Sequence, residues 1–401
     1  MVLKIPFIKT IELEKSIEEI IEKTVDKSKK STINLIDSVL KKKSIAFAFI
    51  APFNLDNIEI DSIEKTKIYL EKLNLSTLSL DFYSGTLMAL QKAKNLGINL
   101  EVDTYDNKNS FEEIDKIANS KKIKNYDFIL GPFIPRNINR LSSMLSEFNT
   151  PIVSPLTSKE INLNKNIFQS IPPVELQREL MFRHVDSLIL QDPDPCVMII
   201  YDTSTENVKE ELLKRFPYAE LIDTDLTMGL VDPEITDSLL VEQKNNLVFL
   251  ESQNLNIITS VSSLLNSQIS KERNINMLSS YRSETYENEN ISFQHLGNLK
   301  FTYPTYFYPK YDEELNELND LFFENFGKLP NKIVIRAYEI TLDLILRSAF
   351  RRKLVKSINI GETKYYQNRF KYKKLNNGYI NESVLLIQHD DLDVFEITSE
   401  K

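Results

Sequence analysis

The sequence is short of the residues on which several common kinds of site depend. Its one cysteine, Cys196, excludes a disulfide framework and a cysteine-based metal site. There is no tryptophan, and none of the eight glycines belongs to a phosphate-holding loop. No apolar run reaches the ~18 residues that a membrane helix needs, and no charged-then-apolar secretory signal opens the sequence. Either the chain is cytosolic or the start of its gene product lies upstream.

The charge balance argues against a nucleic-acid partner. The formal net charge is -9, so the basic excess that phosphate binding needs is missing. Apolar residues make up 42% of the chain and charged residues 27%, which is ordinary for a globular protein. A length of 401 residues predicts about two core-forming units rather than one.

Catalytic signatures are also missing. The sequence has no nucleophile-elbow, Walker or zinc-protease motif. The three histidines are isolated from one another: His184, His295 and His389. None has a metal-ligating neighbour at helical spacing, which argues against a zinc site. We therefore predict a non-enzymatic protein without a metal or other cofactor.

Two charged clusters near the C-terminus have plain structural interpretations. The acidic cluster stands between two short predicted strands and indicates a hairpin turn: Asp390, Asp391 and Asp393. The basic cluster stands at the end of a predicted helix: Arg347, Arg351, Arg352, Lys353 and Lys356. Cations at a helix C-terminus interact favourably with the helix dipole, although an acidic polymer is an alternative partner for them.

From residue 44 onward, short apolar strands alternate with helical patterns. A first series runs through the predicted strands 44–53, 98–105, 126–130 and 151–154, with helices between them. A second series begins at residue 174 and continues to about 279. The stiff segment Ile171-Pro172-Pro173 separates the two series. Alternation of this kind predicts an α/β protein with two lobes, each a parallel sheet flanked by helices. Residues 9–42 are polar, and we predict a linker with weak amphipathic helix there.

Four segments, taken in order, resemble the type I periplasmic binding proteins, the group that includes the leucine/isoleucine/valine-binding proteins. They are Asp81-Phe82-Tyr83-Ser84-Gly85 with Ala89 and Gly97; Tyr105-Asp106; Ile129-Leu130-Gly131-Pro132 with 150–155; and 312–350, with Phe326-Gly327-Lys328-Leu329-Pro330 before a long helix. The resemblance spans about residues 44–401. It implies a two-lobed fold with three hinge crossings, near 171–173, 299–304 and 349–355. Lobe one is then 44–171 plus 304–350, and lobe two is 173–298 plus 355–401.

A narrower resemblance concerns the cell envelope. The segments 154–159 and 167–173 are similar to bacterial envelope proteins, typical of Bacteroidetes, in which LysM peptidoglycan-binding repeats precede such a domain. Met1-Val2-Leu3-Lys4-Ile5-Pro6 resembles the closing strand of a LysM repeat, so residues 1–8 are predicted to be a remnant of one. This implies a periplasmic or envelope location, with the signal sequence and the repeats upstream of this fragment.

The family's ligands sit at the carboxyl ends of the parallel strands, which selects nine candidates. They are Phe53, Gly131, Pro132, Ser154 and Thr157 in lobe one, and Tyr201, Asp202, Glu251 and Ser279 in lobe two. A hydroxyl at Ser154 or Thr157 suits a ligand carboxylate, or else it caps the next helix. Glu251 or Asp202 suits an ammonium group, or else each is a solvated strand-end carboxylate.

Two departures from the amino-acid binders decide which function we favour from sequence. Tyr201-Asp202 stands where those proteins usually have Tyr-Gly, and no aromatic clamp is evident near Phe53. The favoured prediction is therefore an envelope binding or scaffold module with peptidoglycan or cell-wall machinery as partner. The alternative is a solute receptor of the ABC-transporter type for an amino acid or small peptide.

Overall fold

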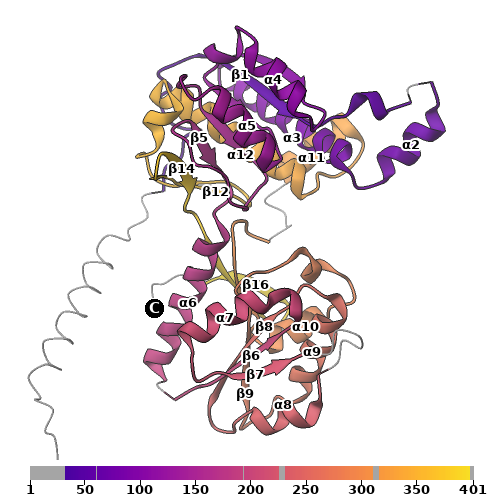
Figure 1. The fold of residues 1–401 in the computed structure, drawn as a ribbon, viewed down its shortest axis with the longest axis vertical. Coiled ribbons are helices and arrows are strands. Elements are labelled where there is room, and N and C mark those ends of the chain that lie inside the picture. Colours follow the sequence, from indigo (N-terminus) through magenta and orange to yellow (C-terminus); the bar gives the residue numbers. More distant parts are fainter. Residues whose placement is uncertain (1–31, 60, 193, 225–230, 310–315, 398–401) are drawn as a thin grey trace, which may run out of the picture.

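The chain forms two α/β lobes joined by three crossing segments (Figure 1). The structure is a computed structural model, and it describes residues 32–59, 61–192, 194–224, 231–309 and 316–397. The predicted LysM remnant at 1–8 lies outside the described residues. Within the described part of the chain, no helix is long and apolar enough to cross a membrane.

Lobe one is built on a seven-stranded sheet in the order β13-β14-β5-β4-β3-β1-β2. Apart from the antiparallel β13–β14 pair, its neighbouring strands are parallel. Its strands are β1 (Ser44–Ala51), β2 (Asn99–Asp106), β3 (Phe128–Leu130), β4 (Ile152–Ser154), β5 (Ile167–Gln169), β13 (Tyr372–Leu375) and β14 (Gly378–Asn381). Its helices are α2 (Ile63–Glu71), α3 (Leu75–Asn95), α4 (Phe111–Asn119), α5 (Pro135–Met144), α11 (Asn316–Phe326) and α12 (Lys332–Arg351).

Lobe two repeats this architecture with the strand order β16-β15-β10-β9-β8-β6-β7. Its strands are β6 (Cys196–Tyr201), β7 (Glu220–Asp223), β8 (Asn245–Glu251), β9 (Asn274–Leu278), β10 (Thr302–Thr305), β15 (Leu385–Asp390) and β16 (Asp393–Glu396). Its helices are α6 (Val174–Gln191), α7 (Glu206–Arg215), α8 (Pro233–Leu239), α9 (Leu255–Ser267) and α10 (Phe293–Asn298). Asp390 pairs with Asp393 at the β15–β16 turn, which confirms the predicted acidic hairpin.

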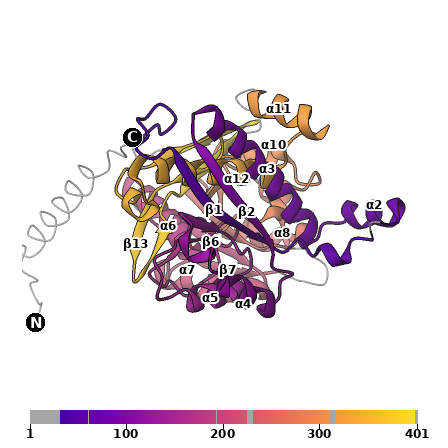
Figure 2. The same cartoon turned by 90° about the horizontal axis from the view of Figure 1, so that it is seen from above.

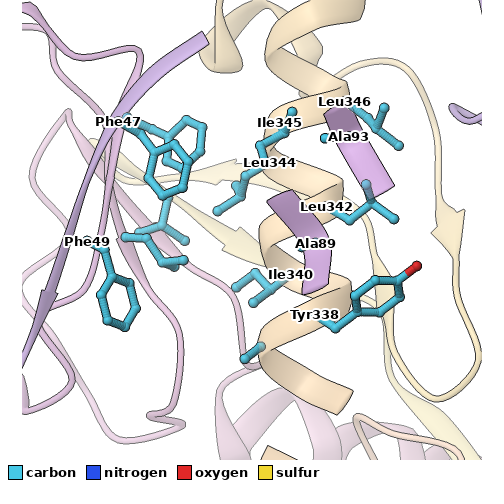
Figure 3. Packing of buried hydrophobic residues seen from close by; sticks show 14 of the residues in the cluster. Phe47, Phe49, Ala89, Ala93, Tyr338, Ile340, Leu342, Leu344, Ile345 and Leu346 are labelled. Atoms are coloured by element: carbon cyan, nitrogen blue, oxygen red, sulfur yellow. The ribbon is translucent and has the colours of Figure 1, made fainter. Parts of the chain in front are cut away.

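Each sheet separates two apolar layers, because successive side chains of a strand point to opposite faces. On β1, Phe47 and Phe49 pack toward α3 and α12, while Ala48 and Ile50 pack toward α4 and α5. In Figure 3 the small residues of α3 lie directly against the apolar side chains of α12. Gly85 of α3 allows the closest approach, since a Cβ added there would stand 2.1 Å from the Val334 carbonyl oxygen. The close packing of α3 against α12 therefore requires glycine at position 85.

The sheet order corrects the predicted positions of two crossings. The first crossing, between β5 and α6, falls at Ile171–Pro173. The second follows β10, which ends at Thr305 inside the lobe-two sheet, rather than lying within 299–304. The third lies between β14 and β15, not at 349–355, so residues 363–381 belong with lobe one. Helical and apolar patterns could not reveal this, because the short strands β13 and β14 return to the first sheet, while β11 (Thr363–Lys364) and β12 (Arg369–Phe370) form a separate two-stranded sheet before them.

The end of the predicted linker is part of lobe one. Leu35 is buried in the lobe-one core, and the backbone N–H groups of Lys41 and Lys42 both donate to the Ala349 carbonyl at 2.9 Å. Thr32 forms a bridge with Glu362. Ile33 and Leu40 pack against the same core, so the polar composition of this stretch concealed the apolar side chains that hold it in place.

Candidate functional site

In lobe one, the predicted ligand residues lie at the edge of the sheet from which the chain leaves for lobe two. Ser154 ends β4 and pairs in register with Gln169, the last residue of β5. Ser170, the next residue, donates its N–H and its hydroxyl to the Ser154 carbonyl, at 3.1 and 2.7 Å. The Ser154 backbone is therefore fixed directly to the first crossing.

In lobe two, the predicted residues share the corresponding edge. Tyr201 pairs in register with Glu251 across β6 and β8. The Ser279 N–H donates to Thr302, on the strand that leads into the second crossing. Both sheets thus turn the carboxyl ends of their parallel strands toward the crossings, the position at which open α/β sheets present ligand sites.

The hydroxyls of Ser154 and Thr157 do not cap a helix. No helix forms between Pro155 and Asn166, all of whose residues are described. The Thr157 hydroxyl accepts the Lys159 N–H at 3.1 Å in a local turn. The Ser154 side chain is 0% exposed, and its hydroxyl has no hydrogen-bond partner among the described residues. A buried hydroxyl without a partner costs free energy, so this oxygen marks a position where a further polar group would be stabilising.

The two lobe-two carboxylates differ in how fully they are used. Asp202 accepts from the Ser204 N–H at 2.8 Å and from the Ser252 hydroxyl at 2.5 Å, so it is occupied by its own turn. Glu251, 3% exposed, has one backbone donor, the Ser280 N–H at 2.6 Å from Oε1. Burial raises the pKa of the Glu251 carboxyl to about 7, and the Ser280 N–H opposes that rise. Of the two acids, Glu251 is the one with capacity for a cation.

The other predicted residues have local structural roles. Phe53 packs edge-on against Phe49 and Tyr83 in the core. Gly131 has φ +99°, and an added Cβ would stand 2.0 Å from the Ile50 carbonyl oxygen, so glycine is required on steric grounds; Pro132 follows it through a cis peptide bond.

Pro132 is itself buried. The Tyr201 ring lies 4.8 Å from the Lys209 ammonium, an arrangement that favours a cation–π contact. The Ser279 hydroxyl donates to the Tyr281 carbonyl at 3.0 Å. These contacts give Tyr201 and Ser279 reasons to be present that do not involve a ligand.

Sequence reasoning missed Arg336, which joins the first two crossings from helix α12. Its guanidinium donates to the Ser170 hydroxyl at 2.8 Å, at the first crossing. It lies 5.6 Å from the ring centre of Tyr306, just after β10 at the second crossing. It also donates to Asn368 Oδ1 at 2.6 Å. An arginine inside an apolar helix pattern was the only available signal.

The connection to the third crossing runs through Asn381, the last residue of β14. Its amide donates to the Ser170 carbonyl at 3.0 Å and to the Arg369 carbonyl at 2.9 Å. The third crossing is therefore bonded to the first, which is in turn bonded to Arg336. We call Ser170, Tyr306, Arg336, Asn368 and Asn381 the hinge knot.

Further charges continue along the same face of α12. Glu339 accepts from the backbone N–H groups of Gln367 and Asn368, at 3.0 and 2.8 Å. Arg347 pairs with Asp343 at 2.7 Å, and both side chains are fully buried. The interpretation of Arg347 as a helix-dipole cation is thus wrong, because its guanidinium is buried inside lobe one and pairs with Asp343.

Ion pairs also connect the lobes directly. Lys332 Nζ, at the start of α12, lies 2.7 Å from Glu284 and 3.3 Å from Glu287 of lobe two. The Arg369 guanidinium of β12 pairs with the Glu396 carboxylate of β16 at 2.5 Å. Among the described residues, no group of three metal-ligating side chains gathers at this interface or elsewhere.

Two seven-stranded α/β sheets joined by three crossings form the type I periplasmic-binding-protein fold. No protein-family model matches the sequence, and no curated protein is significantly similar to it. Solved structures share the fold at low identity, so they show the fold alone.

A putative branched-chain amino acid ABC transporter from Rhodospirillum rubrum is 10% identical, with 89% of this chain and 100% of that one covered and a TM-score of 0.59. An ABC-type branched-chain amino acid transporter from Rhodopseudomonas palustris is 11% identical, with 89% and 96% covered and a TM-score of 0.56. A branched-chain amino acid ABC transporter periplasmic ligand-binding protein from Burkholderia xenovorans is 8% identical, with 88% and 94% covered and a TM-score of 0.56. These structures support the fold and give no support to LysM repeats or a peptidoglycan partner.

Proposed function

We propose that this chain is a solute-binding receptor that closes its two lobes on a small ligand with an α-amino-acid group, free or at the end of a short peptide. We further propose that it acts in the periplasm or cell envelope and has no catalytic step of its own. The fold and the ligands named for the structural neighbours support this reading.

The observation that carries the proposal is Glu251. It lies at the lobe-facing edge of the second sheet, it is buried, and its carboxylate receives one backbone N–H. Burial makes the ionised form of this acid costly, and a ligand ammonium group beside it would offset that cost. Ser154 and Thr157 are then assigned to the ligand carboxylate, through the unpartnered Ser154 hydroxyl and the nearby backbone. Hinge closure between the lobes would bring the two halves of this site together.

A dye-based thermal-shift screen of amino acids, di- and tripeptides and muropeptides tests the proposal. A ligand at 100 times its Kd stabilises the folded state by about 2.7 kcal/mol, which is a shift of roughly 5 °C or more for lobes of this size. The shift is expected to disappear in Glu251→Gln and in the double variant Ser154→Ala/Thr157→Ala. Ser143→Ala, on the outer helix α5, is the matched control and should respond as the parent does.

Two results would count against the receptor. One is an unchanged affinity in the Ser154/Thr157 double variant, which removes the carboxylate site from the proposal. The other is a shift with muropeptides alone that survives Glu251→Gln, which restores peptidoglycan as the partner.

A further inference from the structure

An arm projects from lobe one between β1 and α3. It consists of residues 54–59 and 61–74 and contains helix α2 (Figures 1 and 2). In both views α2 stands clear of the two lobes, far from the crossings. The base of the arm is tied down on both sides. The N–H of Asn54 donates to Asp106 at 3.1 Å, and the Tyr69 hydroxyl lies 2.7 Å from that of Ser76 in α3. The arm is thus a fixed projection.

The arm exposes more apolar surface than its length explains. Ile63 is 87% exposed and Leu73 is 93% exposed, and three more large apolar side chains are exposed beside them: Leu55, Ile68 and Leu70. No residue of α2 is buried. A nine-residue helix is marginal in water without packing partners, because helix nucleation is costly and isolated helices below ~12–15 residues rarely persist. Something outside this chain's lobes must therefore cover the helix if it is to be stable.

One face of α2 forms an apolar groove with the segment before it. The groove is lined by Ile58, Ile63, Thr66, Lys67, Leu70 and Glu71. Its helical members are spaced at i, i+3, i+4, i+7 and i+8, so they form a single stripe. We call this stripe together with Ile58 the arm face.

We propose that the arm face pairs with the arm face of a second copy of this chain, with the two α2 helices antiparallel about a twofold axis. A twofold contact uses the same patch on both partners, so the patch must complement itself. The arm face does so in shape, since it carries both the groove and the projecting side chain of Ile63; Leu73, exposed just after α2, would extend the apolar contact.

The charges of the arm face complement themselves as well. Lys67 and Glu71 line the same groove, 3.9 Å apart on one helix. In an antiparallel pair whose axis passes between them, Lys67 of each copy stands opposite Glu71 of the other. Opposite charges on facing helices set partner orientation, while like charges there destabilise the pair.

The size of the face sets the expected strength. With the axis between Lys67 and Glu71, the two helices overlap over residues 67–71 only, roughly 6 Å, whereas stable protein interfaces usually exceed about 1,000 Å² in total. A contact limited to the arms is smaller than that, so we expect a reversible dimer that dissociates on dilution.

Sedimentation velocity of the full chain between about 1 and 200 μM tests the pairing, with a dimer expected at the upper end. Ile63→Asp and Leu73→Asp should each weaken dimerisation at least tenfold. Leu190→Asp is the matched control, because Leu190 is also exposed, at 79%, but lies on α6 of lobe two. Equal thermal unfolding of all variants shows that they fold.

A charge exchange makes the test specific. Lys67→Glu alone places two glutamates opposite each other and Glu71→Lys alone places two lysines opposite each other, so each is expected to be monomeric. An equimolar mixture of these two variants should form heterodimers, and the double variant K67E/E71K should recover the homodimer. A monomer at every concentration overturns the proposal, whether or not the arm then binds lipid vesicles. A dimer that Ile63→Asp and Leu73→Asp leave intact overturns it too.

Discussion

Replacing Glu251 by glutamine is expected to change how the stability of the protein depends on pH. Burial holds the pKa of the Glu251 carboxyl at about 7, against 4.5 for the same group without that environment. Between these two pH values the folded state keeps the proton while the unfolded chain has released it. The folded state therefore binds more protons than the unfolded state, and the free energy of unfolding falls as pH rises from 4.5 to 7.

The size of the effect follows from the difference of about 2.5 pH units. Each pH unit corresponds to 1.36 kcal/mol. Ionisation of this carboxyl therefore lowers the free energy of unfolding by about 3 kcal/mol between pH 4.5 and pH 7. Glutamine does not ionise and keeps a group that fits the same space. Glu251→Gln is therefore expected to match the parent near pH 5 and to be more stable than it by about 3 kcal/mol at pH 8.

Urea unfolding at pH 5, 6, 7 and 8 measures this difference. Glu242→Gln, an exposed carboxylate of the same lobe, serves as the control and should leave the pH dependence as it is. Glu339 is a second buried acid whose pKa burial raises to about 7, so it contributes a similar slope that remains in Glu251→Gln. If the parent and Glu251→Gln run parallel from pH 5 to 8, the carboxyl is not held protonated, and the argument from burial is refuted.

Three further predictions concern the packing of lobe one, the hinge knot and the proposed ligand. Gly85→Ala should lower the free energy of unfolding by about 3 kcal/mol, since the new Cβ must displace the Val334 carbonyl of α12; unchanged denaturant unfolding would contradict this. Arg336→Met should cost about 2–4 kcal/mol by leaving Ser170 and Asn368 without a buried donor; a neutral result would mean that the hinge knot is held by its other members. A ligand ammonium that needs ionised Glu251 should bind about tenfold more weakly at pH 6 than at pH 8, measured by calorimetry; equal affinities would place the ammonium elsewhere.

The sequence predicted the architecture well because the relevant signals are local. Alternating apolar strands and helical stripes are set by neighbouring residues, and the two series with Ile171-Pro172-Pro173 between them correspond to the two lobes. The third crossing was misplaced because β13 and β14 are short, and β14 pairs with β5, some two hundred residues earlier. Nothing within a local window specifies such a return.

The site was predictable only as a set of positions. Strand ends could be read from the pattern, and the structure puts Ser154, Tyr201, Glu251 and Ser279 at the lobe-facing edges. The difference between Asp202 and Glu251 cannot be read from the sequence. The Ser252 hydroxyl donates to Asp202, whereas the backbone donor to the Glu251 carboxyl is the Ser280 N–H. Arg336 was missed for the same reason, since its partners come from three distant segments.

The burial of Glu251 also bears on which ligands the proposed site would accept. Near pH 7 about half of the free protein has this carboxyl protonated. The ionised half carries a buried negative charge, which lowers the stability of the folded state. A cationic group restores the balance, whereas a neutral group of the same shape meets a protonated acid that offers only an ordinary hydrogen bond. An amino acid and its deaminated analogue would then differ most above pH 7, where the free protein bears the uncompensated charge, and least near pH 5. The acid that destabilises the empty receptor at high pH is, on this reasoning, the group that makes it selective.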